Sequence, residues 1–213
     1  MINDSNTVHM YPPNPFRIDH SEEQAVELLT QHLQQRLRVY RGYSDIVVFC
    51  IGTDRSTGDA LGPIVGSHLE RMYPSNVSIY GTLDSPVHAV NLQETIDYVK
   101  KKHTNPLIIA IDACLGQLNS VGKITVAHGP IKPGAGVKKQ LPEVGTFHIT
   151  GIVNIGGFME YFVLQNTRLS VVMKMSEIIA TSLYSAIVHI KESPYRYMPN
   201  IGNRSSLYQS ASE

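Results

Sequence analysis

The chain contains few of the residues that mark specialised protein classes. Its 213 residues include no Trp and only two cysteines, Cys50 and Cys114, too few for a disulfide framework or a metal-type Cys pair. Each cysteine lies within or just after an apolar run, where we expect a small buried residue rather than a nucleophile. A disulfide-built secreted scaffold is therefore excluded, and a reducing compartment is expected.

The chain also lacks an excess of either positive or negative charge. The 18 basic residues equal the 18 acidic ones, so the formal net charge is +0. No electrostatic footprint for nucleic acid or an anionic membrane follows from this balance. No continuous apolar run approaches the roughly 20 residues that span a bilayer, and the N-terminal residues lack an apolar signal core. We therefore expect a cytoplasmic protein with neither nucleic acid nor membrane as a partner.

Helical and strand patterns alternate through the rest of the chain, whose hydrophobic content of 42% fits a globular core. Residues 21–24 (S-E-E-Q) match a capping box and predict a helix to about residue 40. We expect strands over 46–51, 77–82, 107–111, 121–128 and 146–155, and further helices over 60–71, 91–102, from 158, and over 168–191. This alternation predicts a three-layer α/β/α sandwich with a mostly parallel central sheet. Residues 1–20 are expected to form an arm, 21–192 a single domain, and 193–213 a flexible tail.

A carboxylate follows the first predicted strand. The apolar run 46–51 ends at Gly52, and Asp59 comes seven residues later, just before a helix start marked by Gly and Pro. In open α/β sheets, ligands bind outside the carboxyl ends of the strands, where this loop would lie. Asp59 is therefore a candidate catalytic acid, although Gly and Asp are also ordinary residues of turns and helix caps.

A second acid occupies the same setting. Asp112 directly follows the run 107–111 (L-I-I-A-I), which is apolar throughout, as expected of a strand buried on both faces. Two parallel strands that each end in an aspartate would bring two carboxylates to one edge of the sheet. Such a pair is costly unless it is used or satisfied, so we interpret Asp59 and Asp112 as a site. The alternative is that Asp112 only caps the following turn.

Five further residues are candidates for support or substrate binding. Gly134 and Gly136 lie in a P-G-A-G-V loop that would allow close approach of another chain, although it is not a P-loop. His148 lies in an apolar strand, where a histidine is commonly a satisfied core residue but can also serve acid–base or metal chemistry. Asp54 and Arg55 lie in the first loop, where exposed loop charges are the simpler interpretation.

The chain resembles the YyaC family of sporulation proteins, which are relatives of the germination protease and, more distantly, of the hydrogenase-maturation peptidases. Four motifs carry the resemblance: G-T-D-R-S-T-G-D-A-L-G-P (52–63), I-D-A-C-L-G (111–116), P-G-A-G-V (133–137) and H-I-T-G-I-V-N-I-G-G-F-M-E-Y-F-V-L-Q-N-T-R-L (148–169). They are spread over most of the predicted core.

The resemblance implies a phosphorylase/hydrolase-like fold and hydrolysis of peptide bonds. The germination protease has essential acids in a D-A-L-G-P loop and an I-D-A motif, which correspond here to Asp59 and Asp112. The hydrogenase-maturation peptidases hold a metal with two acids and a histidine; His148 has the third role here by position only, not by motif. The first loop departs from both relatives, because T-D-R-S-T-G replaces an Asn-containing turn, and the chain is much shorter than the germination protease.

Three hypotheses for function follow. In the first, the chain is a peptidase that cuts a protein substrate during sporulation or germination, and Asp59 and Asp112 hold a water without any cofactor. In the second, a divalent metal lies between the same acids, with His148 as a third ligand. In the third, the chain is a non-catalytic module that binds a protein on the same fold. The oligomeric state is left open by the sequence.

Overall fold

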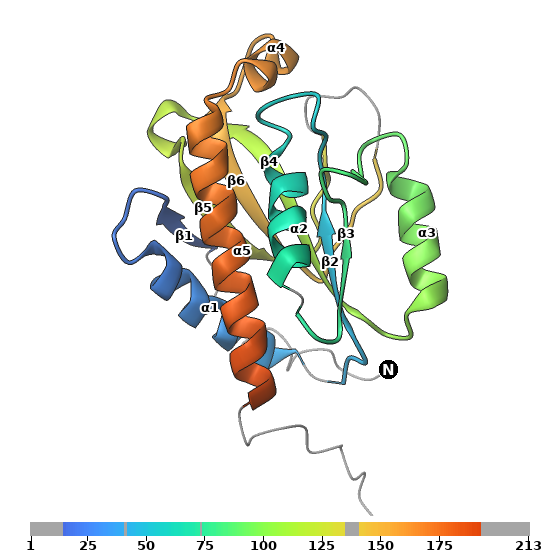
Figure 1. Ribbon diagram of the computed structural model, residues 1–213. Helices are drawn as coiled ribbons and strands as arrows, with labels where there is room; N and C mark the ends of the chain where they lie inside the picture. Colours follow the sequence, from blue (N-terminus) through green and yellow to red (C-terminus); the bar gives the residue numbers. More distant parts are fainter. Residues whose placement is uncertain (1–14, 41, 73, 135–140, 193–213) are drawn as a thin grey trace, which may run out of the picture.

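The computed structural model describes residues 15–40, 42–72, 74–134 and 141–192. Within these ranges six strands form one sheet in the order β1-β5-β6-β4-β2-β3 (Figure 1). The sheet consists of β1 (Phe16–Asp19), β2 (Ile46–Cys50), β3 (Val77–Tyr80), β4 (Leu107–Gly116), β5 (Lys123–His128) and β6 (Phe147–Ile155). Strands β6, β4, β2 and β3 are mutually parallel, and β5 runs antiparallel to both of its neighbours. The predicted mostly parallel sheet is confirmed.

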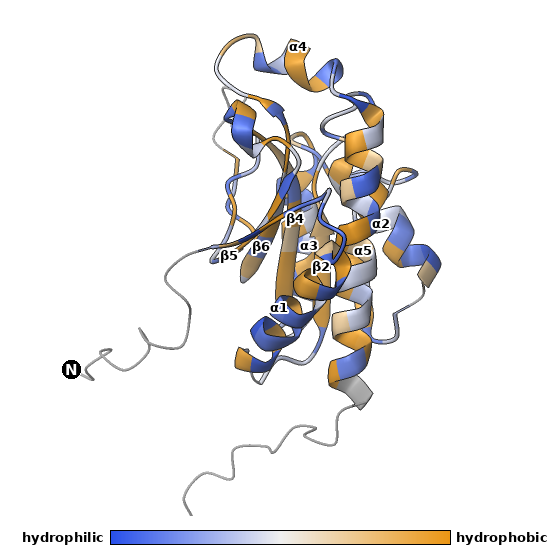
Figure 2. Cartoon of the chain, turned by 90° about the vertical axis from the view of Figure 1, so that its left-hand side faces the viewer, coloured by the Kyte–Doolittle hydropathy of each residue, from blue (hydrophilic) through white to orange (hydrophobic). Residues whose placement is uncertain are grey.

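Helices cover both faces of this sheet. Helices α1 (Ala25–Val39), α2 (Leu61–Met72) and α5 (Leu169–Glu192) pack on one face, and α3 (Leu92–Lys102) packs on the other. Figure 2 shows α2 and α5 stacked on the same side of the sheet. All five residues of β2 are buried, because alternate side chains meet the helices of opposite layers. The α/β/α class predicted from the sequence is thus confirmed.

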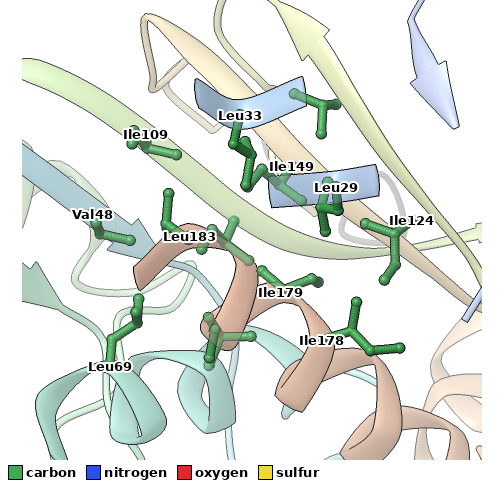
Figure 3. Close-up of a cluster of buried hydrophobic side chains, with 14 of the residues drawn as sticks. Leu29, Leu33, Val48, Leu69, Ile109, Ile124, Ile149, Ile178, Ile179 and Leu183 are labelled. Carbon is green, nitrogen blue, oxygen red and sulfur yellow. The ribbon is translucent and has the colours of Figure 1, made fainter. Parts of the chain in front are cut away.

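The larger core lies between the sheet and the layer of α1, α2 and α5. Figure 3 shows how side chains from all three helices meet those of the central strands. Leu29 and Leu33 of α1 lie against Ile124 and Ile149 of β5 and β6 in this view. These side chains are fully buried and close-packed, so this core joins α1 rigidly to the sheet.

Helix α5 has the length predicted for residues 168–191, and it is strongly apolar although no long continuous apolar run marks it. Residues 169–190 have a mean hydropathy of 1.4, which by length and composition alone would allow a membrane span. More than half of this window is buried inside the fold, where α5 packs against α1 and α2. A core helix of the domain accounts for both its length and its apolar character.

The N-terminal boundary differs from the prediction. Residues 16–19, assigned to an arm, form β1 and pair with Lys123 to Val126 of β5. The capping box is also wrong: helix α1 begins at Ala25, and its cap residue Gln24 makes no side-chain capping bond. Ser21 instead donates its backbone N–H and its hydroxyl to Asp19. The tail expected over 193–213 lies outside the described residues.

Candidate active site

The loop between β2 and α2 carries the first acid at the carboxyl end of the sheet. Gly52 has a positive φ of 147°, and a Cβ there would overlap the backbone carbonyl oxygen of Asp59. That same carbonyl accepts the N–H of Thr53 at 3.2 Å. Only glycine allows the two ends of the loop to close in this way. The apolar strand, the glycine and the acid are therefore one structural unit that fixes Asp59 directly before α2.

The second acid lies within β4 rather than after it. The sequence predicts a strand that ends at residue 111, but β4 continues to Gly116 because its later residues still pair with β6. The partner strand β2 ends at Cys50, which lies opposite Ile111. Asp112 is therefore the first residue of β4 beyond the end of β2. As predicted, Asp112 lies at a strand end, but the strand that ends there is its neighbour β2 and not β4.

The two carboxyl groups interact electrostatically. Burial raises the pKa of Asp112 well above its ordinary value, and the negative charge of Asp59 raises it further. The backbone N–H of Ala113, which donates to the Asp112 carboxylate at 2.9 Å, partly opposes this rise in pKa. Burial also raises the pKa of Asp59, and the neighbouring Ser56 partly offsets that rise. The fold thus places two acids close together in a poorly solvated place, where one of them retains a proton more readily than in water.

Ser56 is a polar residue of this loop that the sequence analysis did not select. Its hydroxyl is buried and, among the residues that the structure describes, accepts or donates no hydrogen bond of good geometry. The hydroxyl lies close enough to the Asp59 carboxyl to lower its pKa, and it retains hydrogen-bonding capacity for a ligand or a water molecule. Only its place three residues before Asp59 in the sequence could have indicated that Ser56 belongs to the site.

Strand β6 adds a polar side to the site. Thr150 pairs with Asp112 in the register of β4 and β6, and His148 pairs with Ala110, so both lie on the face of the sheet that carries Asp112. Burial raises the pKa of the Cys114 thiol to about 11, and the neighbouring Thr150 partly opposes this rise. The ring Nδ1 of His148 lies 2.9 Å from the carbonyl oxygen of Gly129. His148 is therefore near the acids but is held by the backbone.

Among the other candidates that the structure describes, none makes a hydrogen bond to the side chain of either acid. Asp54 and Arg55 are exposed. The Thr53 hydroxyl donates a hydrogen bond to the carboxylate of Asp54 and accepts one from the backbone N–H of Arg55. Asp54 lines a separate groove beside α2. Gly134 has a positive φ of 71° and is described, whereas Gly136 lies outside the described residues, so the role of this loop stays a prediction.

The donor set for a metal is incomplete in the described part of the chain. No group of three His, Cys, Asp or Glu side chains is arranged there to hold a metal ion. The Gly129 carbonyl occupies only Nδ1 of His148, but His148 does not form a group with the two acids among the described residues, which leaves two carboxylates as the donors that the fold brings together. Two carboxylates alone are a poor match for the three or more protein ligands of a catalytic zinc site.

A short helix, α4 (Glu160–Gln165), completes this end of the molecule and lies above the sheet in Figure 1. The N–H of Gly58, the residue before Asp59, donates to the carbonyl of Leu164 at 2.9 Å. The side-chain amide of Asn154 at the end of β6 donates to Val163 and Thr167. The first bond ties α4 to the loop of Asp59 and the others tie this segment to β6, and the sequence predicted none of them.

Comparison with known families places the chain. Residues 17–182 match the family model described as "Protein of unknown function (DUF1256)". The chain belongs to the DUF1256 family. The matched region of the DUF1256 chain includes both acids, the loop that holds Asp59, and α4. The family description assigns no activity, so the chemistry must be argued from the site.

Similar proteins agree with this placement. "Uncharacterized protein YyaC" of Bacillus subtilis (strain 168) is 54% identical over 166 residues, which are 78% of the DUF1256 chain and 80% of that protein. The resemblance to the YyaC family is confirmed. A crystal structure of a [NiFe] hydrogenase maturation protease, HycI from Thermococcus kodakarensis KOD1, has 17% identity and a TM-score of 0.43, covering 68% of this chain and 96% of its own. A likeness of that size carries no argument about chemistry.

Proposed function

We propose that the chain is a peptidase that hydrolyses a peptide bond with Asp59 and Asp112. The observation that supports this most directly is the electrostatic interaction of the two acids in a largely buried place at the carboxyl end of the sheet. Acids with perturbed pKa values at the ligand-binding edge of an open sheet are typical of catalytic sites. The D-A-L-G-P and I-D-A motifs, which resemble those of the germination protease, support the same assignment.

The environments of the two acids suggest different roles. Asp112 is more deeply buried, and the charge of Asp59 raises its pKa further, so Asp112 holds the shared proton. Asp59 is then the ionised partner and takes a proton from a water molecule held between the two acids. The protonated Asp112 donates to the carbonyl oxygen of the scissile bond as the water attacks its carbon and forms a tetrahedral diol. As the C–N bond then breaks, Asp59 gives the proton taken from the water to the leaving amine, and Asp112 takes a proton back from the diol. A free amine and a carboxylic acid are released, and both acids return to their starting states. The Ser56 hydroxyl, next to Asp59, is positioned to orient that water.

No step in this mechanism passes through a metal, because the donor set among the described residues does not fit one. We therefore expect a chelator to leave cleavage unchanged. A metal between the acids would predict instead that activity is lost on chelation and restored by a divalent ion. Chelation followed by metal analysis of the purified protein separates the two versions.

The substrate class follows from the resemblance alone: we propose a protein substrate of sporulation or germination, cut inside the cell. The test is an unbiased peptide-cleavage screen of the wild type against the Asp59→Asn/Asp112→Asn double variant. The matched control is Asp54→Asn, which changes an exposed acid in the same loop. Cleavage by the wild type and the control, with none by the double variant, supports the proposal.

A non-catalytic binding module is the second candidate, and one observation favours it. Large apolar side chains on α4 are exposed next to the site, as a protein-binding surface requires. A screen in which the wild type cleaves nothing but retains peptides would support the binding module over the peptidase.

A further inference from the structure

An apolar surface surrounds α4 at the end of the molecule that carries the acids. We call it the α4 patch: Ile155, Phe158, Met159, Tyr161 and Phe162, whose exposed fractions lie between 42% and 83%. No residue of α4 itself is buried. The helix stands above the sheet in Figure 1, and apolar (orange) ribbon is visible along it in Figure 2. Contiguous exposed apolar side chains of this size mark an interaction site.

The patch contains a cavity of about 380 Å³, between the end of β6 and α4. Ile155, Phe158, Phe162 and Val163 form its apolar walls. The amides of Asn154 and Asn166 also line it, but they already bond to their own neighbours: Asn154 to Val163 and to the N–H of Ile155, and Asn166 to the carbonyl of Phe162. The cavity therefore offers contact to an apolar side chain and few unused polar groups.

The cavity lies close to the loop of Asp59. Leu164, which follows the lining residue Val163, accepts the hydrogen bond from the N–H of Gly58, the residue before Asp59. Along β6, Asn154 lies four residues beyond Thr150, which pairs with Asp112. Four residues of extended chain span about 13 Å, so an extended peptide that crosses this end of the sheet from the acids would reach the cavity about four residues from the cleaved bond.

We propose that the α4 patch binds one large apolar side chain, Phe or Leu in size, of an extended peptide substrate about four residues from the cleaved bond. This inference rests on the proposed peptidase function and adds a substrate class to it. Charge does not contribute, since Glu160 and Arg168 are the only charged residues between 154 and 169. Recognition by an aromatic-walled cavity therefore selects for apolar character.

A second copy of the chain is a poorer occupant for this surface. Stable interfaces between proteins take about 20–30 residues from each partner, whereas the α4 patch comprises five side chains. A single substrate residue flanked by extended backbone needs only a cavity of the size observed. The patch thus suits a peptide better than a dimer.

The test uses the full-length chain and a library of quenched-fluorescence decapeptides in which each position in turn is fixed as Phe, Leu, Ser or Asp. We expect a preference for Phe or Leu at one position about four residues from the cut. The variants Phe162→Ser and Phe158→Ser each change an exposed side chain and should lower kcat/KM for the Phe and Leu peptides about 10- to 100-fold, through KM. Cleavage of the Ser peptides should be unchanged.

Val90→Ser is the matched control, because Val90 is 87% exposed, lies outside the patch and should keep the preference. Fluorescence anisotropy of the same peptides with Asp112→Asn separates binding from turnover. Cleavage without any apolar preference, or a preference that both Phe variants retain, overturns the inference and leaves the peptidase standing. Absence of cleavage, with Phe peptides still bound through Phe162, overturns the peptidase while supporting the patch. Sedimentation velocity tests the remaining occupant. If the wild type is a dimer and Phe162→Ser is a monomer, the surface binds a second copy of the chain and the inference is overturned.

Discussion

Replacement of Asp112 by Asn should increase stability while it removes activity. The buried carboxyl has a pKa well above its ordinary value of 3.8. Between these two pKa values, the folded state retains a proton that the unfolded chain has released. The free energy of unfolding of the wild type therefore falls as pH rises through this window, and levels off above the folded pKa. Asn does not titrate, and its side-chain oxygen can still accept the Ala113 N–H.

The magnitude follows from the size of the shift. Each unit by which the folded pKa exceeds the ordinary one makes the variant more stable than the wild type by about 1.4 kcal/mol once pH is above the folded pKa. For a chain of this length, each kcal/mol corresponds to roughly 2–4 °C in Tm. The two proteins should have nearly equal stability below the ordinary pKa, where the carboxyl is protonated in both states. Urea unfolding at a series of pH values measures the difference curve directly.

Asp54→Asn is the control, because the side chain is exposed and its replacement should change stability by less than about 0.5 kcal/mol at any pH. One result would refute the reasoning. If Asp112→Asn is less stable than the wild type at neutral pH, the carboxylate is ionised and well satisfied in the folded state. A bound cation, rather than a shared proton, would then be the better account of the site.

The remaining predictions concern the loop, the thiols and the histidine. Gly129→Ala should lower the free energy of unfolding by about 1 kcal/mol, because the residue has a positive φ. Gly52→Ala should lower it by roughly 1–3 kcal/mol more in urea unfolding, because the added Cβ would overlap the Asp59 carbonyl oxygen. Equal losses in the two variants would show that the loop closes differently. Burial raises the pKa of both Cys50 and Cys114, the latter to about 11, so iodoacetamide at pH 7.5 should label the folded chain far more slowly than the unfolded one; rapid labelling of Cys114 would contradict this. His148→Ala should leave the divalent metal content of the purified protein unchanged, and a loss of metal on this substitution would favour the metal-dependent version.

The sequence was most informative where burial alone determines the structure. Residues 46–51 are apolar throughout because helices cover both faces of β2, and this composition was sufficient to predict a central strand. A loop after this strand was also predicted, because the apolar run ends at Gly52, whereas its closure on the Asp59 carbonyl is seen only in the structure. Local composition thus located both acids at the carboxyl end of the sheet.

Features that depend on pairing between distant residues could not be predicted in this way. Residues 16–19 are too short and too polar to indicate a strand, and they form β1 only because β5 offers an unpaired edge. Strand β4 extends past Asp112 because β6 continues beside it, although the run after residue 111 is no longer uniformly apolar. The bond between Gly58 and Leu164 joins segments more than 100 residues apart, and no local pattern indicates it.

The most direct test of the central claim is to measure turnover of one cleaved peptide by the wild type, Asp59→Asn, Asp112→Asn and the Asp54→Asn control. The account predicts that the wild type and the control cleave the peptide, while each of the other two variants remains folded and shows no detectable turnover. Full activity in both Asp59→Asn and Asp112→Asn would contradict it.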